Sequence, residues 1–327
     1  MRGETFSLRR DHNGLRSVYN LGNERGDCPN ACRFCNIGRS PQVSSADNIR
    51  EFDRQHEVFL RHLNGPYHPL IYNQGNATNR AEFSEQTLTH VLSAFRRDPR
   101  VVFVSLNSRH CYASRELLES LLRLNLTFPI HFIFGVESLS PRASQIFGKD
   151  TRGELKRFID VLKWFNQRTR RTVRAGYEFG LDLNLVFLPE MYLEDHATRL
   201  GNEARVATGM RLELAELLSR LDPLVPVEIN LHPYYRVETL PYEDMDLEFF
   251  MANLPGLQAM VDEHNTANPS CRTHIFVGVE GSGYESEHHL SQIARWKDAI
   301  ERFNTTGDCH WDTPATRHRG SSEITKH

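Results

Sequence analysis

The chain has few cysteines, no long apolar run and no excess of basic charge. Its six cysteines in 327 residues are too few and too scattered for the disulfide framework of a small secreted domain. The opening stretch, MRGETFSLRRDHNG, lacks the apolar core of a signal peptide, and no apolar segment is long enough to span a bilayer. We therefore expect a reduced, cytoplasmic setting and no membrane partner.

The charge balance limits the kinds of partner. Lysine and arginine total 39 against 42 aspartates and glutamates, a formal net charge of -3, whereas nucleic-acid binders usually carry a basic excess or stripe. The one dense basic run, FNQRTRRTVR at residues 165–174, follows an amphipathic segment and is typical of a solvated helix end. A nucleic-acid partner is therefore disfavoured.

Apolar segments rich in β-forming residues alternate along the chain with helical patterns. This alternation indicates parallel strands joined by crossover helices. The expected strands lie at residues 16–21, 68–74, 100–106, 129–136, 181–189, 226–233 and 273–279. The expected helices lie at residues 84–97, 114–124, 153–167, 197–221, 246–265 and 290–303.

Six or seven such units predict an α/β fold, a partial (β/α)6-type barrel of the TIM kind. We expect the barrel core to occupy residues 1–240 and an α/β extension at residues 241–304 to pack on it. The polar residues 305–327 are poor in aliphatic side chains and are expected to form a flexible tail. Functional side chains of a parallel barrel lie at the carboxyl ends of its strands, which is where we look for them.

Half of the cysteines lie in one short stretch, DCPNACRFCNIG at residues 27–38. Cys28, Cys32 and Cys35 follow the spacing Cys-x3-Cys-x2-Cys, and the Pro and Gly residues around them indicate a loop. A structural zinc site or a closed iron-sulfur cubane needs four protein ligands. Three clustered thiolates would leave one iron open to bind a small molecule.

Two other interpretations of this stretch remain open. The three cysteines could form part of a zinc site that one of the sixteen histidines completes, or the pattern could be a chance arrangement in a loop. The remaining cysteines, Cys111, Cys271 and Cys309, are far apart in the sequence and form no second cluster-like pattern. We expect that these three are not metal ligands.

The stretch resembles the signature of the radical S-adenosylmethionine (radical SAM) enzymes, in which an aromatic residue, here Phe34, precedes the third cysteine. The resemblance implies that Cys28, Cys32 and Cys35 hold a [4Fe-4S] cluster whose fourth iron binds SAM. It further implies that an external one-electron reductant of the flavodoxin or ferredoxin type drives cleavage of SAM. The products are methionine and a 5'-deoxyadenosyl radical that abstracts hydrogen from a substrate.

The resemblance continues after the second and third expected strands. Gln74, Gly75 and Asn76 occupy the place of a Gly-Gly-Glu turn whose backbone receives the SAM amino group, although one glycine and the acid are replaced. An ordinary turn is the alternative interpretation. The segment LNSRHCY resembles ESRPEY of elongator-type proteins and of the archaeosine synthase radical subunit, with Asn107 in place of the acid. Asn107 is thereby implied as a SAM contact.

The fourth strand ends in GVES, which resembles an element whose acid contacts SAM, followed by a basic residue that holds the methionine carboxylate. Glu137 and Lys149 correspond to these two positions. The alternatives are a helix N-terminal acid and a solvated charge. The fifth strand resembles one that flanks adenine, and Asn184 is its polar candidate.

The substrate is much harder to predict from the sequence, because one fold supports many chemistries. The absence of further cysteine clusters and the acidic balance favour a small polar substrate such as a nucleoside or sugar nucleotide in specialised biosynthesis. Its expected contacts are Tyr72, Arg109, His232 and Tyr234, with the alternative that these are ordinary rim or structural residues. A tRNA-modifying enzyme and a non-catalytic iron-sulfur or zinc-binding barrel are the alternative functions.

Overall fold

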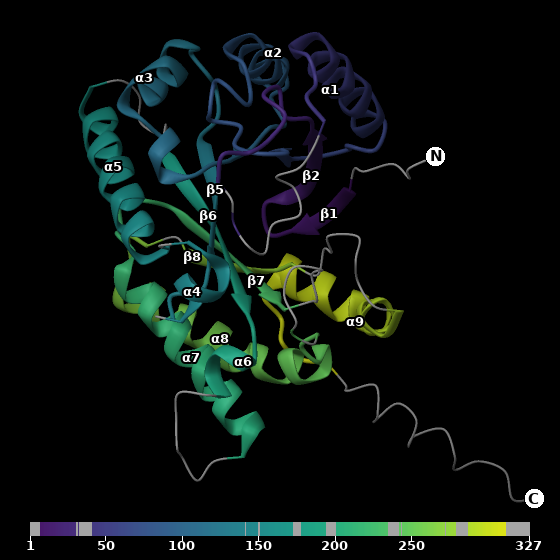
Figure 1. Ribbon diagram of the computed structural model, residues 1–327, viewed down its shortest axis with the longest axis vertical. Helices are drawn as coiled ribbons and strands as arrows, with labels where there is room; N and C mark the ends of the chain where they lie inside the picture. Colours follow the sequence, from purple (N-terminus) through teal and green to yellow (C-terminus); the bar gives the residue numbers. More distant parts are fainter. Residues whose placement is uncertain are drawn as a thin grey trace, which may run out of the picture.

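The computed structural model describes residues 7–30, 32, 41–140, 142–149, 151–172, 178–193, 201–234, 242, 244–271, 273–278 and 287–311. Within these ranges, eight strands form one curved sheet (Figure 1). The strands are β1 (Ser7–Asp11), β2 (Gly14–Leu21), β3 (Tyr67–Asn73), β4 (Val104–Asn107), β5 (Ile130–Glu137), β6 (Phe179–Phe187), β7 (Val227–Pro233) and β8 (Thr273–Val277).

Helices connect successive strands, which lie in sequence order across the sheet. All neighbours from β2 to β8 are parallel, and β1 pairs antiparallel with β2. The helices lie around the outside of the curve (Figure 1). They are α1 (Ser45–Leu60), α2 (Glu85–Arg96), η1 (His110–Tyr112), α3 (Arg115–Arg123), α4 (Ala143–Phe147), α5 (Thr151–Thr172), α6 (Glu190–Leu193), α7 (Asn202–Arg220), α8 (Leu247–Ala267) and α9 (Glu287–Thr306).

The α/β barrel-type fold expected from the sequence is confirmed. Its seven parallel strands are one more than a six-unit barrel has, because β8, in the segment expected as an extension, continues the sheet beside β7. The two edges of the sheet approach each other where the ring centroids of His12 and His274 lie 4.2 Å apart. The barrel is therefore nearly closed.

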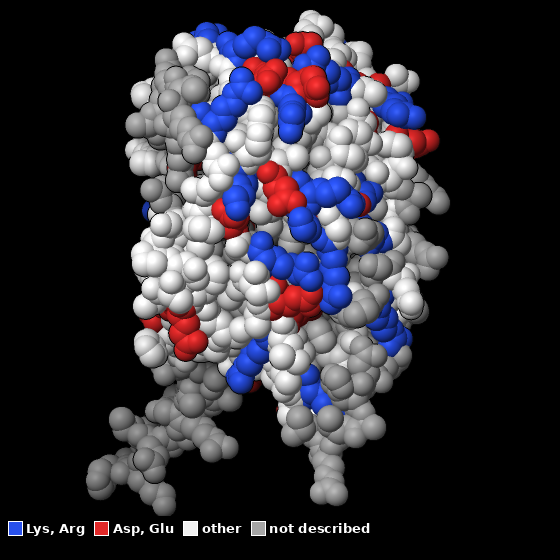
Figure 2. Space-filling model, turned by 90° about the vertical axis from the view of Figure 1, so that its left-hand side faces the viewer, with Lys and Arg blue, Asp and Glu red and all other residues white. Residues whose placement is uncertain are grey.

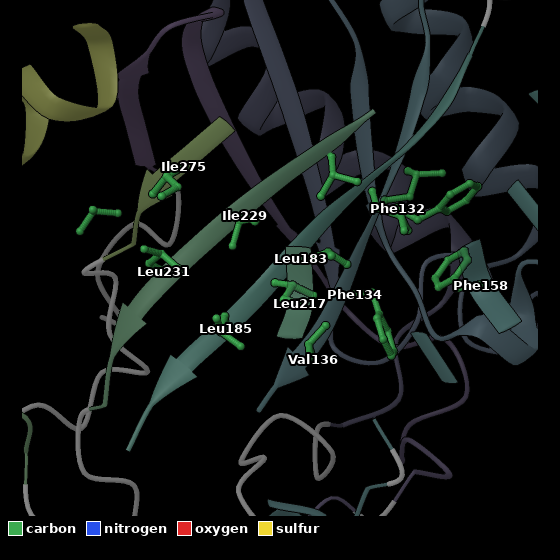
Figure 3. Packing of buried hydrophobic residues seen from close by; sticks show 14 of the residues in the cluster. Phe132, Phe134, Val136, Phe158, Leu183, Leu185, Leu217, Ile229, Leu231 and Ile275 are labelled. Atoms are coloured by element: carbon green, nitrogen blue, oxygen red, sulfur yellow. The ribbon is translucent and has the colours of Figure 1, made fainter. Parts of the chain in front are cut away.

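The outward face of the sheet forms the main hydrophobic core. Alternate residues of a strand point to the same face, and Leu183 and Leu185 of β6 lie on the face that α5 and α7 cover (Figure 3). They are fully buried, as are Phe158 of α5 and Leu217 of α7. Among the helices in the described ranges, none is long and apolar enough to cross a membrane.

The inward face carries charged residues at the amino-terminal end of the barrel. Arg16 of β2 donates to Asn230 at 3.1 Å and to Asp11 at 3.3 Å, and it also pairs with Glu228. Its guanidinium carbon lies 3.6 Å from the ring centroid of Phe276 on β8. Because β2 and β8 lie near opposite edges of the sheet, Arg16 links the two sides of the near-closed barrel.

A second buried pair belongs to the same end of the barrel. The His131 ring lies 2.9 Å from a carboxylate oxygen of Asp182. Burial acts to raise the pKa of Asp182, but His131 and a hydrogen bond from a serine hydroxyl lower it more, so the pKa falls below its ordinary value. Farther along the strands, Val18, Leu70 and Ile133 form an apolar layer inside the barrel. This layer separates the charged end from the mouth.

Candidate functional site

The expected site residues follow four neighbouring strands at their carboxyl ends. The cysteine loop follows β2, the turn at 74–76 follows β3, Arg109 follows β4, and Glu137 ends β5. Because these strands are neighbours in one parallel sheet, their carboxyl ends lie on one side of the barrel. The fold therefore brings the segments that carry the sequence motifs to a common mouth.

The cysteine loop is described in part. Cys28 and Cys32 are half-buried cysteines that form no disulfide, and Phe34 and Cys35 lie outside the described residues. Within the described ranges, no group of three or more His, Cys, Asp or Glu side chains is arranged to hold a metal ion. The assignment of all three cysteines as ligands stays a prediction.

Asn30 fixes the loop between the first two cysteines. Its amide nitrogen donates to the Cys28 sulfur at 3.6 Å, and its oxygen accepts from Nη1 of Arg109 at 2.9 Å. Arg109 is held in turn by Glu154 of α5, through Nε at 3.1 Å and through Nη2. This chain of contacts ties the cysteine loop to the barrel wall.

The charge state of Arg109 follows from these partners. Burial lowers the pKa of Arg109, but Glu154 raises it more, and the sulfurs of Cys32 and Cys111 act in the same direction. Arg109 therefore stays cationic beside the cysteine loop. Its guanidinium binds Asn30 and Glu154, and the contact with a substrate expected from the sequence stays a prediction.

Asn76 brings the turn after β3 to the cysteine loop. Its Nδ2 donates to the Cys28 sulfur at 3.8 Å and to both carboxylate oxygens of Glu82 at 3.3 Å. Its backbone N–H also donates to Glu82, at 2.9 Å. A Cβ added at Gly75 would lie 1.9 Å from a Glu82 oxygen, so only glycine fits the turn as it is packed. The two motifs that resemble a cluster loop and a cofactor turn are thus in contact.

Glu82 is a further residue of the candidate site that no sequence motif indicated. Its side chain is fully buried, and it accepts hydrogen bonds from the side chains of Asn23, Asn76 and Asn79. A buried carboxylate that is surrounded by amide donors orients those amides. The available sequence signal was the lone acid that follows the asparagine-rich run NQGNATN.

Asn107 and Gln74 support the same turn. The Asn107 side chain accepts from the backbone N–H groups of Asn73 at 3.2 Å and Ala77 at 3.1 Å, and it donates to the Gly75 carbonyl at 2.7 Å. Gln74 has an exposed side chain and accepts through its carbonyl from the Asn23 amide at 2.8 Å. The contacts of Asn107 indicate that it shapes the turn, and its contact with SAM stays a prediction.

Glu137 and Lys149 form a buried pair at the end of β5. Lys149 Nζ lies 3.4 Å from Oε2 of Glu137, donates to the Gly135 carbonyl, and lies 4.7 Å from the centroid of the Phe134 ring. Both charged side chains are largely buried. Burial raises the pKa of Glu137 above its ordinary value, although Lys149 opposes the shift. The backbone of Glu137 has a φ of 54°, a left-handed conformation that is uncommon outside glycine.

The remaining candidates lie in different surroundings. Asn184 accepts from the Asn230 amide at 3.0 Å. Tyr72 packs against the apolar layer inside the barrel, and His232 packs against Gly278, where an added Cβ would lie 2.2 Å from the ring. Tyr234 is 3% exposed and belongs to the hydrophobic core. Contact of Tyr72, His232 and Tyr234 with a substrate stays a prediction.

The hydrogen-bond donors around the cysteines at the barrel mouth are of a kind that suits an iron-sulfur cluster. Two amides donate to the Cys28 sulfur and the Arg109 guanidinium interacts with Cys32, and N–H donors stabilise thiolates that bind iron. Cys111 lies in η1 and is exposed, and burial of part of its thiol together with nearby acids raises its pKa. A raised pKa disfavours the thiolate form that metals bind. Cys111 therefore favours the neutral thiol.

Comparisons with known proteins give one finding on the fold. No protein-family model and no curated protein matches the chain. Among solved structures, a radical SAM methyltransferase from Sphaerobacter thermophilus is similar in chain path, with a TM-score of 0.48 and 10% identity over 85% of this chain and 70% of that chain. A likeness of this size leaves the function to be argued from the chain's own residues.

Proposed function

We propose that the chain is a radical SAM enzyme in which Cys28, Cys32 and Cys35 bind a [4Fe-4S] cluster. The observation that carries the proposal is the 3.8 Å contact between the Asn76 amide and the Cys28 sulfur. It joins two residues that are 48 positions apart in the sequence, in segments that each resemble a part of one cofactor site. The neighbouring strands β2 and β3 bring the loop and the turn together, and three clustered thiolates beside a glycine-containing turn favour a cluster with one open iron over a four-ligand zinc site.

The chain's own residues have distinct parts in this proposal. When bound and reduced, the cluster supplies the electron that cleaves SAM to methionine and a 5'-deoxyadenosyl radical. Glu137 accepts hydrogen bonds from the ribose hydroxyls or the ammonium group of SAM, and Lys149 attracts its carboxylate. The backbone of the turn at Gly75 receives the ammonium group, and Glu82 and Asn107 hold that turn in place.

A small polar substrate fits the surface better than tRNA. Figure 2 shows Lys and Arg side chains interleaved with Asp and Glu on the face that includes α5. Two lysines of α5 are paired: Lys163 lies 2.6 Å from Asp222, and Lys156 lies 2.7 Å from Asp160. Paired charges weaken the long-range attraction of a polyanion. We therefore favour hydrogen abstraction from a nucleoside-like or sugar-like molecule.

The carboxylate role of Lys149 gives a direct test of the SAM site. In Lys149→Met the aliphatic stem is kept and the charge is lost, and we expect SAM binding to weaken by about tenfold or more. Lys156→Met is the matched control, because Lys156 is exposed and pairs with Asp160 on the surface of α5. Equal SAM affinity in the wild type and Lys149→Met would remove Lys149 from the site.

The substrate class is tested by 5'-deoxyadenosine formation. The reconstituted protein is supplied with SAM and dithionite, and then separately with nucleosides, sugar nucleotides or tRNA. We expect a small molecule to raise 5'-deoxyadenosine above the background without substrate. Stimulation by tRNA alone, falling steeply as salt rises, would establish the tRNA-modifying alternative instead.

A further inference from the structure

We propose that Asn30 and Asn76 tune the redox chemistry of the site by donating hydrogen bonds to the sulfur of Cys28. This inference rests on the proposed cluster and goes beyond it, because it assigns a task to two side chains that the cysteine motif does not include. Asn30 comes from the cysteine loop, and Asn76 comes from the turn after β3. Their amide nitrogens lie 3.6 Å and 3.8 Å from Sγ of Cys28.

The orientation of both amides follows from their charged partners. The side-chain oxygen of Asn30 must face Arg109, because a guanidinium has donors and no acceptor. Its NH2 group is therefore the end that faces Cys28. The NH2 group of Asn76 must face Glu82, because a carboxylate only accepts. The same NH2 group has two hydrogens, so it reaches both Glu82 and the sulfur.

These partners also hold the amides in place. Arg109 is fixed by Glu154, and Glu82 is fixed by two further asparagines, Asn23 and Asn79. A donor that is already ordered loses little conformational freedom when it binds a thiolate. The sulfur of Cys28 therefore has two positioned amide donors.

The effect of such donors on a cluster has a definite sign. Reduction adds an electron, and part of the added negative charge resides on the ligating sulfurs. N–H groups aimed at a sulfur stabilise the reduced state more than the oxidised state, so they raise the reduction potential. A carboxylate at position 76 would do the opposite, because it has no hydrogen to donate and would add negative charge beside Glu82.

The test is the midpoint reduction potential of the reconstituted cluster, measured by anaerobic spectroelectrochemistry with EPR detection. We expect a lower potential in Asn30→Asp and in Asn76→Asp, and a larger shift in the double variant. Asn30→Asp keeps an oxygen for Arg109, so it removes the donor while the loop anchor remains. Asn79→Asp is the matched control, because it places the same charge beside Glu82 and its own amide donates to Glu82.

A neutral variant separates hydrogen bonding from charge. Asn76→Leu removes the donor at similar volume, and we expect it to lower the potential as well. If Asn76→Leu has the wild-type potential, or if Asn79→Asp shifts it as much as Asn76→Asp, the hydrogen-bond inference is wrong. Iron content and circular dichroism identify variants that lose the cluster or the fold. If Asn76→Leu is one of them, the comparison of Asn76→Asp with Asn79→Asp, which add the same charge beside Glu82, decides.

Failure of this inference is distinguishable from failure of the proposed function. A wild-type protein that binds a cluster and cleaves SAM, with unchanged potentials in all variants, overturns only the role of Asn30 and Asn76. A wild-type protein that assembles no cluster overturns both proposals.

Discussion

At the residue scale, His232 shows how burial in the fold lowers the pKa of a histidine. Its ring lies inside the barrel against Gly278, and burial together with the charge of Arg16 lowers its pKa from 6.5 to about 4. The unfolded chain therefore binds this proton more readily than the folded chain does. The neutral ring contributes stability that is present above pH 6.5 and is lost as the pH falls toward 4.

We expect His232→Gln to reduce the loss of stability on acidification. The free energy of unfolding of the apoprotein, measured in urea between pH 4 and 6.5, should fall less steeply in this variant than in the wild type. Burial lowers the pKa of His274 to about 4 as well, so part of the slope will remain. His62→Gln, an exposed control, should keep the wild-type slope, and an identical slope in His232→Gln would contradict the account.

Some residues of the candidate site could be predicted from the sequence, and others could not. The motif resemblance assigned Glu137 and Lys149 to one cofactor site, and the structure places their charged groups 3.4 Å apart near the end of β5. Their contact with SAM stays a prediction. Glu82 could not be placed, because nothing local shows that its carboxylate turns back on the preceding turn. Tyr234 could not be told from a rim residue, because its burial depends on packing by distant segments.

At the scale of elements, α1 was missed by apolar periodicity for a physical reason. Two of the four residues on its buried face are the polar Asn48 and Gln55. Asn48 accepts from the Gly22 backbone at 2.8 Å, and Gln55 accepts from the Asn20 backbone at 3.1 Å. The face that packs on β2 is therefore half polar, which weakens the apolar signal that predicts a helix. The main strands carried a clear signal because one of their faces is almost entirely apolar.

The turn after β3 gives a prediction at this scale. In Gly75→Ala the new Cβ would lie 1.9 Å from a Glu82 oxygen and 2.5 Å from the Asn23 amide, so the buried hydrogen-bond cluster must shift. We expect a loss of about 1–3 kcal/mol in the free energy of unfolding and a reduced iron content after reconstitution. Gly65→Ala is the control, because its Cβ would meet nothing within 4 Å. Equal effects of the two substitutions would contradict the packing argument.

At the scale of the whole molecule, the interior of the barrel divides into two ends. Charged residues around Arg16 fill the amino-terminal end, and the candidate site occupies the carboxyl end, with an apolar layer between them. The sequence showed the inward charges only as alternate polar residues in strands. That they meet inside one barrel follows from the order and register of all eight strands, which no local pattern contains.

Arg16 is the residue that this arrangement makes most sensitive. Arg16→Met would leave Asp11 and Glu228 without their shared cation, and breaking a buried ion pair in this way costs about 3–5 kcal/mol. Arg54→Met removes an exposed pair with Glu51 and should cost about 0–1 kcal/mol. Urea unfolding measures both. A loss for Arg16→Met as small as that for Arg54→Met would show that the interior charges do not support the fold.

The central claim is that the cysteine loop holds a cluster that binds SAM directly. EPR spectroscopy of the anaerobically reconstituted and dithionite-reduced protein, recorded with and without SAM, tests it most directly. We predict a [4Fe-4S] signal that changes when SAM is added, that persists in Cys111→Ala, and that is lost in Cys28→Ala, Cys32→Ala and Cys35→Ala. A signal that ignores SAM, or one that survives loss of Cys32 and disappears with Cys111, would contradict the account.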